Sequence, residues 1–346
     1  MNHPPVYPAQ PPLRGVLRAR AEDFLVDELP KFVPEGEGEH LWLRIRKRDW
    51  NTERVADVLA RQAGVPRRSV GYAGLKDRHA VTTQWFSLHL PGRADPDWDG
   101  LPGGIEVLEA VRHRRKLQTG ALAGNRFTLR LTACEGDREA AEALLRGIAV
   151  RGVPNYFGEQ RFGRDAGNLD RARAMFAGDL QVRDRHLRGI YLSAARSALF
   201  NAVLAARVAE GSWDRALPGE ALVLDGSHSF FVVDEIDDVI EARLRARDVH
   251  PSGPLWGRGE LPSRGEARLR DERAAAEYPD LARGLEAAGL EQDRRSLRLV
   301  ARDMDWCWDG ERALELRFAL PPGSYATTVV AALAQTAADN AEIETA

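Results

Sequence analysis

The sequence predicts an α+β protein in which strands dominate both ends of the chain and helices dominate the middle. Its 346 residues are 44% hydrophobic and 29% charged, which is enough material for two globular domains with sizeable cores. Polar and apolar residues alternate at both ends, whereas apolar residues recur at helical spacing from about residue 152 to 299. We therefore expect a discontinuous domain of residues 1–151 and 300–346, with a second domain of residues 152–299 inserted into it.

Composition excludes several classes of protein. The net charge of -3 still permits a basic face for nucleic acid, because binding needs local rather than overall positive charge. Cys134 and Cys307 form neither a disulfide framework nor a zinc site, and the eight histidines lack ligand spacing, so no metal is expected. No apolar run of about 18 residues or signal peptide is present, which predicts a cytoplasmic protein without a membrane span. We expect a monomer.

The first elements follow from alternation and capping signals. Residues 13–29 alternate as one or two strands, and Leu41, Leu43 and Ile45 mark one face of a strand over 41–46. Thr52 is the expected N-cap of a helix that Gly64 ends.

The remaining elements are predicted in the same way. Strands are expected over residues 105–111, 120–131, 306–308 and 313–320. Helices are expected over residues 139–150, 169–176, 193–208, 235–247, 266–288 and 325–337.

The stretch from Ser69 to Gln84 is the strongest candidate for a functional site. Gly71 and Gly74 are expected to loosen a loop that carries a dense polar cluster, residues 76–79, before a strand begins at about Val81. Asp77 is the only carboxylate of that cluster, and its cationic neighbours favour the ionised form. An ionised carboxylate on a loop can act as a nucleophile or general base. The alternative is a solvated turn with a surface ion pair.

Other motifs narrow the chemistry. The sequence contains no Walker loop, no HExxH and no Gly-x-Ser-x-Gly, and nothing in it indicates a nucleotide cofactor. What remains is chemistry that a carboxylate performs unaided, or no chemistry.

Seven stretches in order along the chain resemble one family, the TruD family of tRNA pseudouridine synthases. They are Glu22-Asp-Phe24 with residues 36–40, Asn51-Thr52, residues 73–84, Gly124-Asn-Arg-Phe127, residues 153–163, residues 192–201 and residues 320–327. This resemblance implies a catalytic α+β domain with a curved, mainly antiparallel sheet, and an inserted α/β TRUD domain. It also implies an RNA-binding isomerase of tRNA processing that converts a uridine of tRNA, usually at position 13, into pseudouridine without a cofactor or metal.

The same resemblance assigns roles to individual residues. Asp77 resembles the catalytic aspartate, and Arg18 takes the position of its basic partner. Phe24, Asn125 and Phe127 fall at positions that contact the uridine. Possible RNA contacts are Lys76, Arg78, Arg114, Arg115 and Lys116.

Each assignment has an alternative. Phe24 and Phe127 could be core residues, Asn125 a turn residue, and Arg18 a surface partner of Asp23 or Asp27. At the level of the protein, the alternatives are a catalytically silent RNA binder and a glycosidase of small molecules. The chemical path also has three alternatives: attack at C1′, addition at C6, and loss of the C2′ proton.

Overall fold

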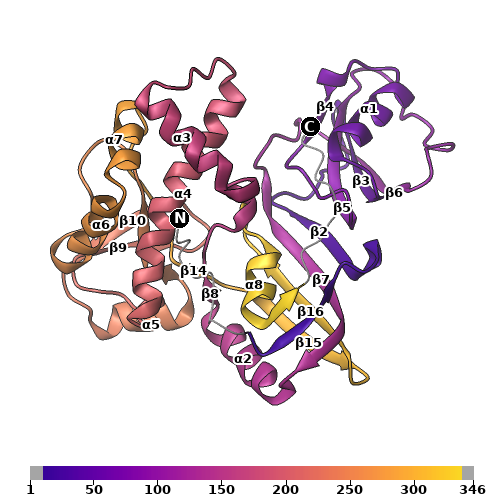
Figure 1. Ribbon diagram of the computed structural model, residues 1–346. Coiled ribbons are helices and arrows are strands. Elements are labelled where there is room, and N and C mark those ends of the chain that lie inside the picture. The colour runs from indigo at the N-terminus through magenta and orange to yellow at the C-terminus, as the bar shows by residue number, and fades with distance from the viewer. Residues whose placement is uncertain (1–10, 337–346) are drawn as a thin grey trace. The chain divides into compact units, whose positions relative to one another are not determined.

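The computed structural model describes residues 11–336, apart from the side chain of Arg164. Chain contacts divide these residues into two compact units. The sheet unit contains residues 11–145, 301–326 and 333–336, and the helical unit contains residues 146–300 and 327–332 (Figure 1). Two helices, α2 (Arg138–Arg151) and α8 (Ala326–Leu333), have residues in both units. The boundaries predicted at residues 152 and 299, and the description of the middle as an inserted domain, stay predictions.

A ten-stranded, mainly antiparallel sheet forms the sheet unit (Figure 1). Its main order is β15-β16-β7-β2-β5-β3-β6, with β1 beside β7 and β17, and β4 beside β5. The strands are β1 (Leu13–Leu17), β2 (Phe24–Pro30), β3 (His40–Arg48), β4 (Val70–Tyr72), β5 (Val81–His89), β6 (Ile105–His113), β7 (Leu122–Gly136), β15 (Arg302–Asp309), β16 (Ala313–Leu320) and β17 (Ala334–Thr336). Only the β2–β5 and β1–β17 pairs are parallel among the described strands.

Strand register determines which side chains share the face of the sheet on which the site lies. Val26 of β2 pairs with Phe127 of β7 and with Thr82 of β5, and Thr82 pairs with Lys47 of β3. Directly paired residues point to the same face, and so do residues two apart in one strand. One face, here called the site face, therefore carries the following residues: Phe24, Val26, Glu28, Ile45, Lys47, Thr82, Gln84, Asn125 and Phe127.

Helix α1 (Thr52–Gln62) packs on part of the site face. Its Val55 and Leu59 are fully buried against Leu43 and Phe86, which are also fully buried. The helix begins where predicted, but its N-cap residue is Asn51 and not Thr52. The Thr52 hydroxyl instead donates to Gln84 Oε1 at 2.9 Å and accepts the Lys76 N–H at 2.9 Å, so this side chain serves the loop rather than the helix.

The helical unit is built around α4 (Arg185–Ala209), whose buried face contacts α3 (Gly167–Ala177) and α7 (Pro279–Ala287) through a shared apolar cluster. The other elements are α5 (Asp238–Ala246), α6 (Gly265–Glu277) and small sheets of β8 (Val153–Pro154), β9 (Glu220–Leu224), β10 (Phe230–Val233), β11 (Val249–His250), β12 (Ser252–Leu255), β13 (Asp293–Ser296) and β14 (Arg298–Leu299). Among the described helices, α4 alone has the length and apolarity to cross a membrane, but 56% of its most apolar stretch is buried inside the protein, as in a core helix.

Several predicted elements have different limits in the structure. The expected helix over residues 266–288 is two helices, α6 and α7, because Pro279 begins the second one. The expected helix over residues 325–337 ends at Leu333, where the chain turns into β17 and pairs with β1. Gly71 is not a loosening residue: a Cβ there would lie 2.4 Å from the Leu117 carbonyl oxygen, so glycine allows two backbones to approach closely.

Candidate active site

Asp77 lies in the loop that joins β4 to β5, residues 73–80, here called the catalytic loop because it carries the candidate catalytic residue. Its side chain is 59% exposed, and its Oδ2 accepts a hydrogen bond of 2.8 Å from Arg18 Nη2. Within the described part of the chain, no hydrogen bond to the other oxygen, Oδ1, is found. One oxygen is thus held by a cation, while the carboxylate side chain as a whole stays largely exposed to solvent.

Arg18 is held in an unusual conformation at the end of β1. Its φ of 63° lies in the left-handed region, which costs a residue with a Cβ on the order of 1 kcal/mol. Its guanidinium stacks 3.9 Å from the centre of the Phe24 ring, and its side chain is only 18% exposed. Arg18 therefore pairs with Asp77, and the alternative pairing with Asp23 or Asp27 is wrong; Asp23 accepts the backbone N–H of Arg20 instead.

The catalytic loop is anchored at several backbone positions by side chains of neighbouring elements. Lys47 Nζ donates to the carbonyl oxygens of Asp77 at 2.7 Å and Lys76 at 3.4 Å. Gln84 Nε2 donates to the Gly74 carbonyl at 3.1 Å, while Thr52 accepts the Lys76 N–H. Loop backbone that is bonded to a packed sheet and helix presents its side chains in a fixed geometry.

Lys76 forms a buried ion pair with Glu28 on the site face. Its Nζ lies 2.9 Å from Glu28 Oε2, and the two side chains are only 6% and 1% exposed. The other Glu28 oxygen accepts the Trp85 N–H at 3.1 Å. This geometry corrects the expectation that Lys76 is an RNA contact: its ammonium is buried and paired, so it supports the loop from inside the protein.

Phe24, Phe127 and Asn125 lie together on the site face. The Phe24 and Phe127 rings meet edge to face with centres 6.3 Å apart, and Phe127 packs on Phe318 of β16 at 5.6 Å. Both rings of the first pair are at least 94% buried, which is the packing expected of core residues. Asn125 pairs with Glu28 in the strand register, and its Oδ1 is buried without a hydrogen-bond partner among the described residues. Such an acceptor is unsatisfied until a donor arrives.

The predicted basic contacts differ in exposure. Arg78, Arg114 and Arg115 are exposed, but Arg114 is bonded to Glu37 and lies 3.5 Å from Glu35. Lys116 is half-buried, and its Nζ donates to the Arg68 carbonyl at 2.7 Å. Arg114, Arg115 and Lys116 belong to the segment that joins β6 to β7. This segment contacts the catalytic loop, because its Gly120 N–H donates to the Ala73 carbonyl at 2.7 Å.

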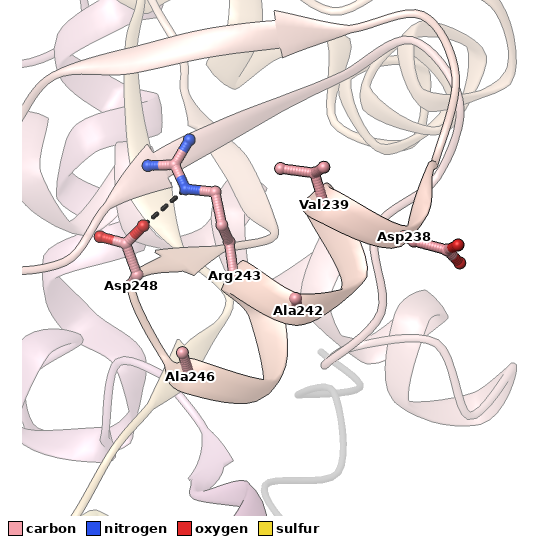
Figure 2. A pocket seen from close by; sticks show the side chains of 6 residues that line it. All are labelled: Asp238, Val239, Ala242, Arg243, Ala246 and Asp248. Atoms are coloured by element: carbon pink, nitrogen blue, oxygen red, sulfur yellow. Dashed lines mark hydrogen bonds and ion pairs between the residues drawn. The ribbon is translucent and has the colours of Figure 1, made fainter.

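Neither of two surface hollows contains Asp77. One, of about 490 Å³, is lined mainly by residues of the opposite face of the sheet, such as Leu25, Asp27 and Thr83, and it also borders Lys47. The other, of about 450 Å³, lies on α5 of the helical unit beside Val239 and Ala242. Figure 2 shows two of its three polar side chains, Arg243 and Asp248, bonded to one another, while Asp238 points away from them. The distance from Arg243 Nε to Asp248 Oδ2 is 2.5 Å. Among the described residues, no group of three His, Cys, Asp or Glu could hold a metal ion.

Sequence reasoning gave no role in this site to Lys47 or Glu28, and it found Thr52 and Gln84 only as members of family-like stretches, without their contacts to the loop. A signal for two of them was present in the alternation. Lys47 follows Leu41, Leu43 and Ile45 on the inward face of β3, and Glu28 follows Phe24 and Val26 on the inward face of β2. A charged residue at an inward strand position needs a partner, and both of these found one at the catalytic loop.

Comparison with known proteins gives one consistent result. The family model for tRNA pseudouridine synthase D (TruD) matches residues 6–171 and 167–333. A Nitrosococcus oceani protein named tRNA pseudouridine synthase D is 52% identical over 335 residues, covering 95% of this chain and 93% of that protein. A Methylococcus capsulatus protein of the same name is 50% identical over 323 residues, covering 93% and 91%.

A comparison of structures agrees with the comparison of sequences. A solved structure of a Methanosarcina mazei protein, described there as a putative tRNA pseudouridine synthase D, superposes with a TM-score of 0.74. The match covers 95% of each chain at 22% sequence identity, and it identifies the α+β fold.

Proposed function

The chain belongs to the TruD family of tRNA pseudouridine synthases, which are isomerases, and we propose that it converts one uridine of tRNA, at position 13, into pseudouridine with Asp77 as its catalytic carboxylate. We further propose that the reaction uses no cofactor or metal, and that the enzyme acts as a cytoplasmic monomer. The observation that carries the residue assignment is the 2.8 Å pair between Arg18 and an exposed Asp77 on a firmly anchored loop.

The proposed reaction is balanced without a second reactant. The N1–C1′ bond breaks, the uracil turns, and C5 bonds to C1′. The proton lost from C5 is matched by the proton gained at N1, so product and substrate have the same atoms. A carboxylate with one free oxygen can engage the ribose or the base while the glycosidic bond is broken, as carboxylates do in glycoside hydrolysis.

The neighbouring residues have complementary roles in this proposal. Arg18 holds Asp77 Oδ2 and keeps positive charge beside the carboxylate. Asn125 Oδ1, which is buried and unpaired, can accept an N–H of the uracil edge. Phe24 and Phe127 are almost fully buried, so in this proposal they back the site by packing, and only the small exposed part of each ring contacts the bound uracil.

Exposed arginines around the catalytic loop would bind the RNA backbone. Arg78 follows Asp77 directly, and Arg114 and Arg115 lie in the segment that is bonded to the loop at Ala73. Arginine forms two-pronged hydrogen bonds with phosphate. The target base must leave the RNA stack to reach Asp77, at a cost of a few kcal/mol. A glycosidase is disfavoured, because the second carboxylate on the site face, Glu28, is buried and paired with Lys76.

Purified protein incubated with unmodified tRNA transcripts tests the function directly. Pseudouridine is mapped by carbodiimide labelling and primer extension, and we expect one new stop, at uridine 13. A transcript with cytidine at that position is the matched control and should give no stop. Tight, salt-sensitive tRNA binding without any stop would contradict the proposal and would identify a silent RNA binder.

Two substitutions of Arg18 distinguish the effect of its positive charge on Asp77 from the effect of its size and shape. Arg18→Ala should lower the single-turnover rate by about 10²-fold, because Asp77 Oδ2 loses its donor and the carboxylate its fixed orientation. Arg18→Lys keeps the charge and should recover most of the rate, although it loses the planar stack on Phe24. The rate is that of pseudouridine formation under single-turnover conditions, with the enzyme in saturating excess over the tRNA. A wild-type rate for Arg18→Ala would contradict the proposed role of Arg18 in catalysis.

A further inference from the structure

Lys47 is a lysine in an environment where lysine is rarely found. Its side chain is 0% exposed, on the inward face of β3 and directly across from Thr82 of β5. A buried ammonium is costly unless hydrogen bonds or opposite charges compensate it. No ion pair of Lys47 is found among the described residues; its ammonium donates hydrogen bonds to the two loop carbonyl oxygens of Lys76 and Asp77. Stability alone would favour an apolar residue here, so the cation has another use.

The hydrogen bonds of the Lys47 ammonium indicate what the charge does. Its 2.7 Å hydrogen bond ends on the carbonyl oxygen of Asp77 itself, so Lys47 holds the backbone of the residue whose side chain Arg18 holds from the other end. Lys47 also lies on the interior side of the loop, buried, whereas the Asp77 carboxylate is exposed. We propose that Lys47 is a positioning residue of the pseudouridine synthase reaction: its buried ammonium fixes the Asp77 backbone and supplies positive charge beside the Asp77 carbonyl oxygen. This inference rests on the proposed function of Asp77.

The charge on Lys47 depends on pH within the working range of an enzyme. Burial lowers its pKa to about 8, with the Asp77 charge opposing this change and the Lys76 charge adding to it. Asp49, two residues further along the chain, also favours the charged form. The other charged groups beside these are Arg18, paired with Asp77, and Glu28, paired with Lys76.

The protonation state of Lys47 determines how the rate depends on pH. Below pH 8 the ammonium is charged and its hydrogen bonds to the two carbonyls are charge-assisted. As the pH rises through about 8, the proton is lost, these bonds weaken and the charge beneath Asp77 disappears. The wild-type rate should therefore fall above pH 8 and approach that of a variant that has no charge at this position.

Lys47→Met tests the proposal, because methionine fills a similar volume without charge or donor. At pH 7 we expect a single-turnover rate about 100-fold below wild type, as expected of a small displacement of a reacting group, with an unchanged dissociation constant for tRNA. The fall in rate near pH 8 should be absent from the variant. Lys31→Met, at an exposed lysine outside the site, is the matched control and should behave as wild type.

A second measurement does not depend on activity. Hydrogen exchange at the amides of residues 76–80 should be faster in Lys47→Met than in wild type and in the Lys31→Met control. If wild-type protein made no pseudouridine, the proposed function would fail, yet the exchange would still decide whether Lys47 holds the loop. A wild-type rate in Lys47→Met, a fall in its rate near pH 8, or unchanged hydrogen exchange in its loop would overturn the proposal.

Lys47→Arg is the second variant, for use if Lys47→Met does not fold. Arginine stays charged, so the fall in rate near pH 8 must be absent from this variant.

Discussion

Asp77→Asn should reduce pseudouridine formation by more than about 10³-fold, while the protein still folds and binds tRNA. The substitution keeps the size of the side chain and an oxygen that can accept the Arg18 hydrogen bond, but it removes the negative charge. Because the side chain is 59% exposed and outside the core, the free energy of unfolding should change little. Only the chemical step then depends on the missing carboxylate.

Three measurements on the same preparation make this prediction sharp. Single-turnover conversion reports the chemical step, a binding titration reports tRNA affinity, and urea unfolding reports stability. Asp165→Asn is a suitable matched control, since this aspartate is also exposed and is not part of the catalytic loop. Product formation near the wild-type rate by Asp77→Asn would refute the assignment, as would a loss of rate that an equal loss of tRNA affinity explains.

Much of the sheet unit could be predicted from alternation alone. The strand over residues 313–320 has the predicted limits in the structure, and β3 extends the predicted strand over residues 41–46 by one residue before and two after it. Alternation reports burial on one face, which is a local property of each strand. The catalytic loop was also found locally, from one carboxylate among cations between two strands.

The partners within the site could not be predicted in the same way, because they depend on register between distant strands. Arg18 and Asp77 are 59 positions apart, and only the family resemblance joined them before the structure did. Thr52 reads as an N-cap from its local sequence, yet its hydroxyl is used by Gln84 and by the loop. The local sequence therefore predicted where the helix starts. It could not predict the tertiary contacts of the Thr52 hydroxyl, which compete with capping for the same oxygen.

The Lys76–Glu28 pair shows how strongly the loop depends on such a contact, and breaking it should have the largest effect on stability. Lys76→Met leaves the Glu28 carboxylate 1% exposed with its Trp85 N–H bond but without its cation. An unpaired buried charge of this kind costs about 3–5 kcal/mol of the free energy of unfolding. Urea unfolding measures this loss, and the loop should lose its fixed geometry together with its anchor.

The double variant Glu28→Gln/Lys76→Met distinguishes a missing partner from a missing residue. Glutamine keeps an oxygen for the Trp85 N–H and removes the charge, so no unpaired ion remains in the core. We expect the double variant to regain most of the stability lost by Lys76→Met, because removing a buried pair together is far less costly than removing one member. A loss in Lys76→Met below about 1 kcal/mol, the range of exposed pairs, would show that water reaches the pair. With stability restored, any rate deficit that persists in the double variant measures what the ion pair contributes to holding Asp77 in place.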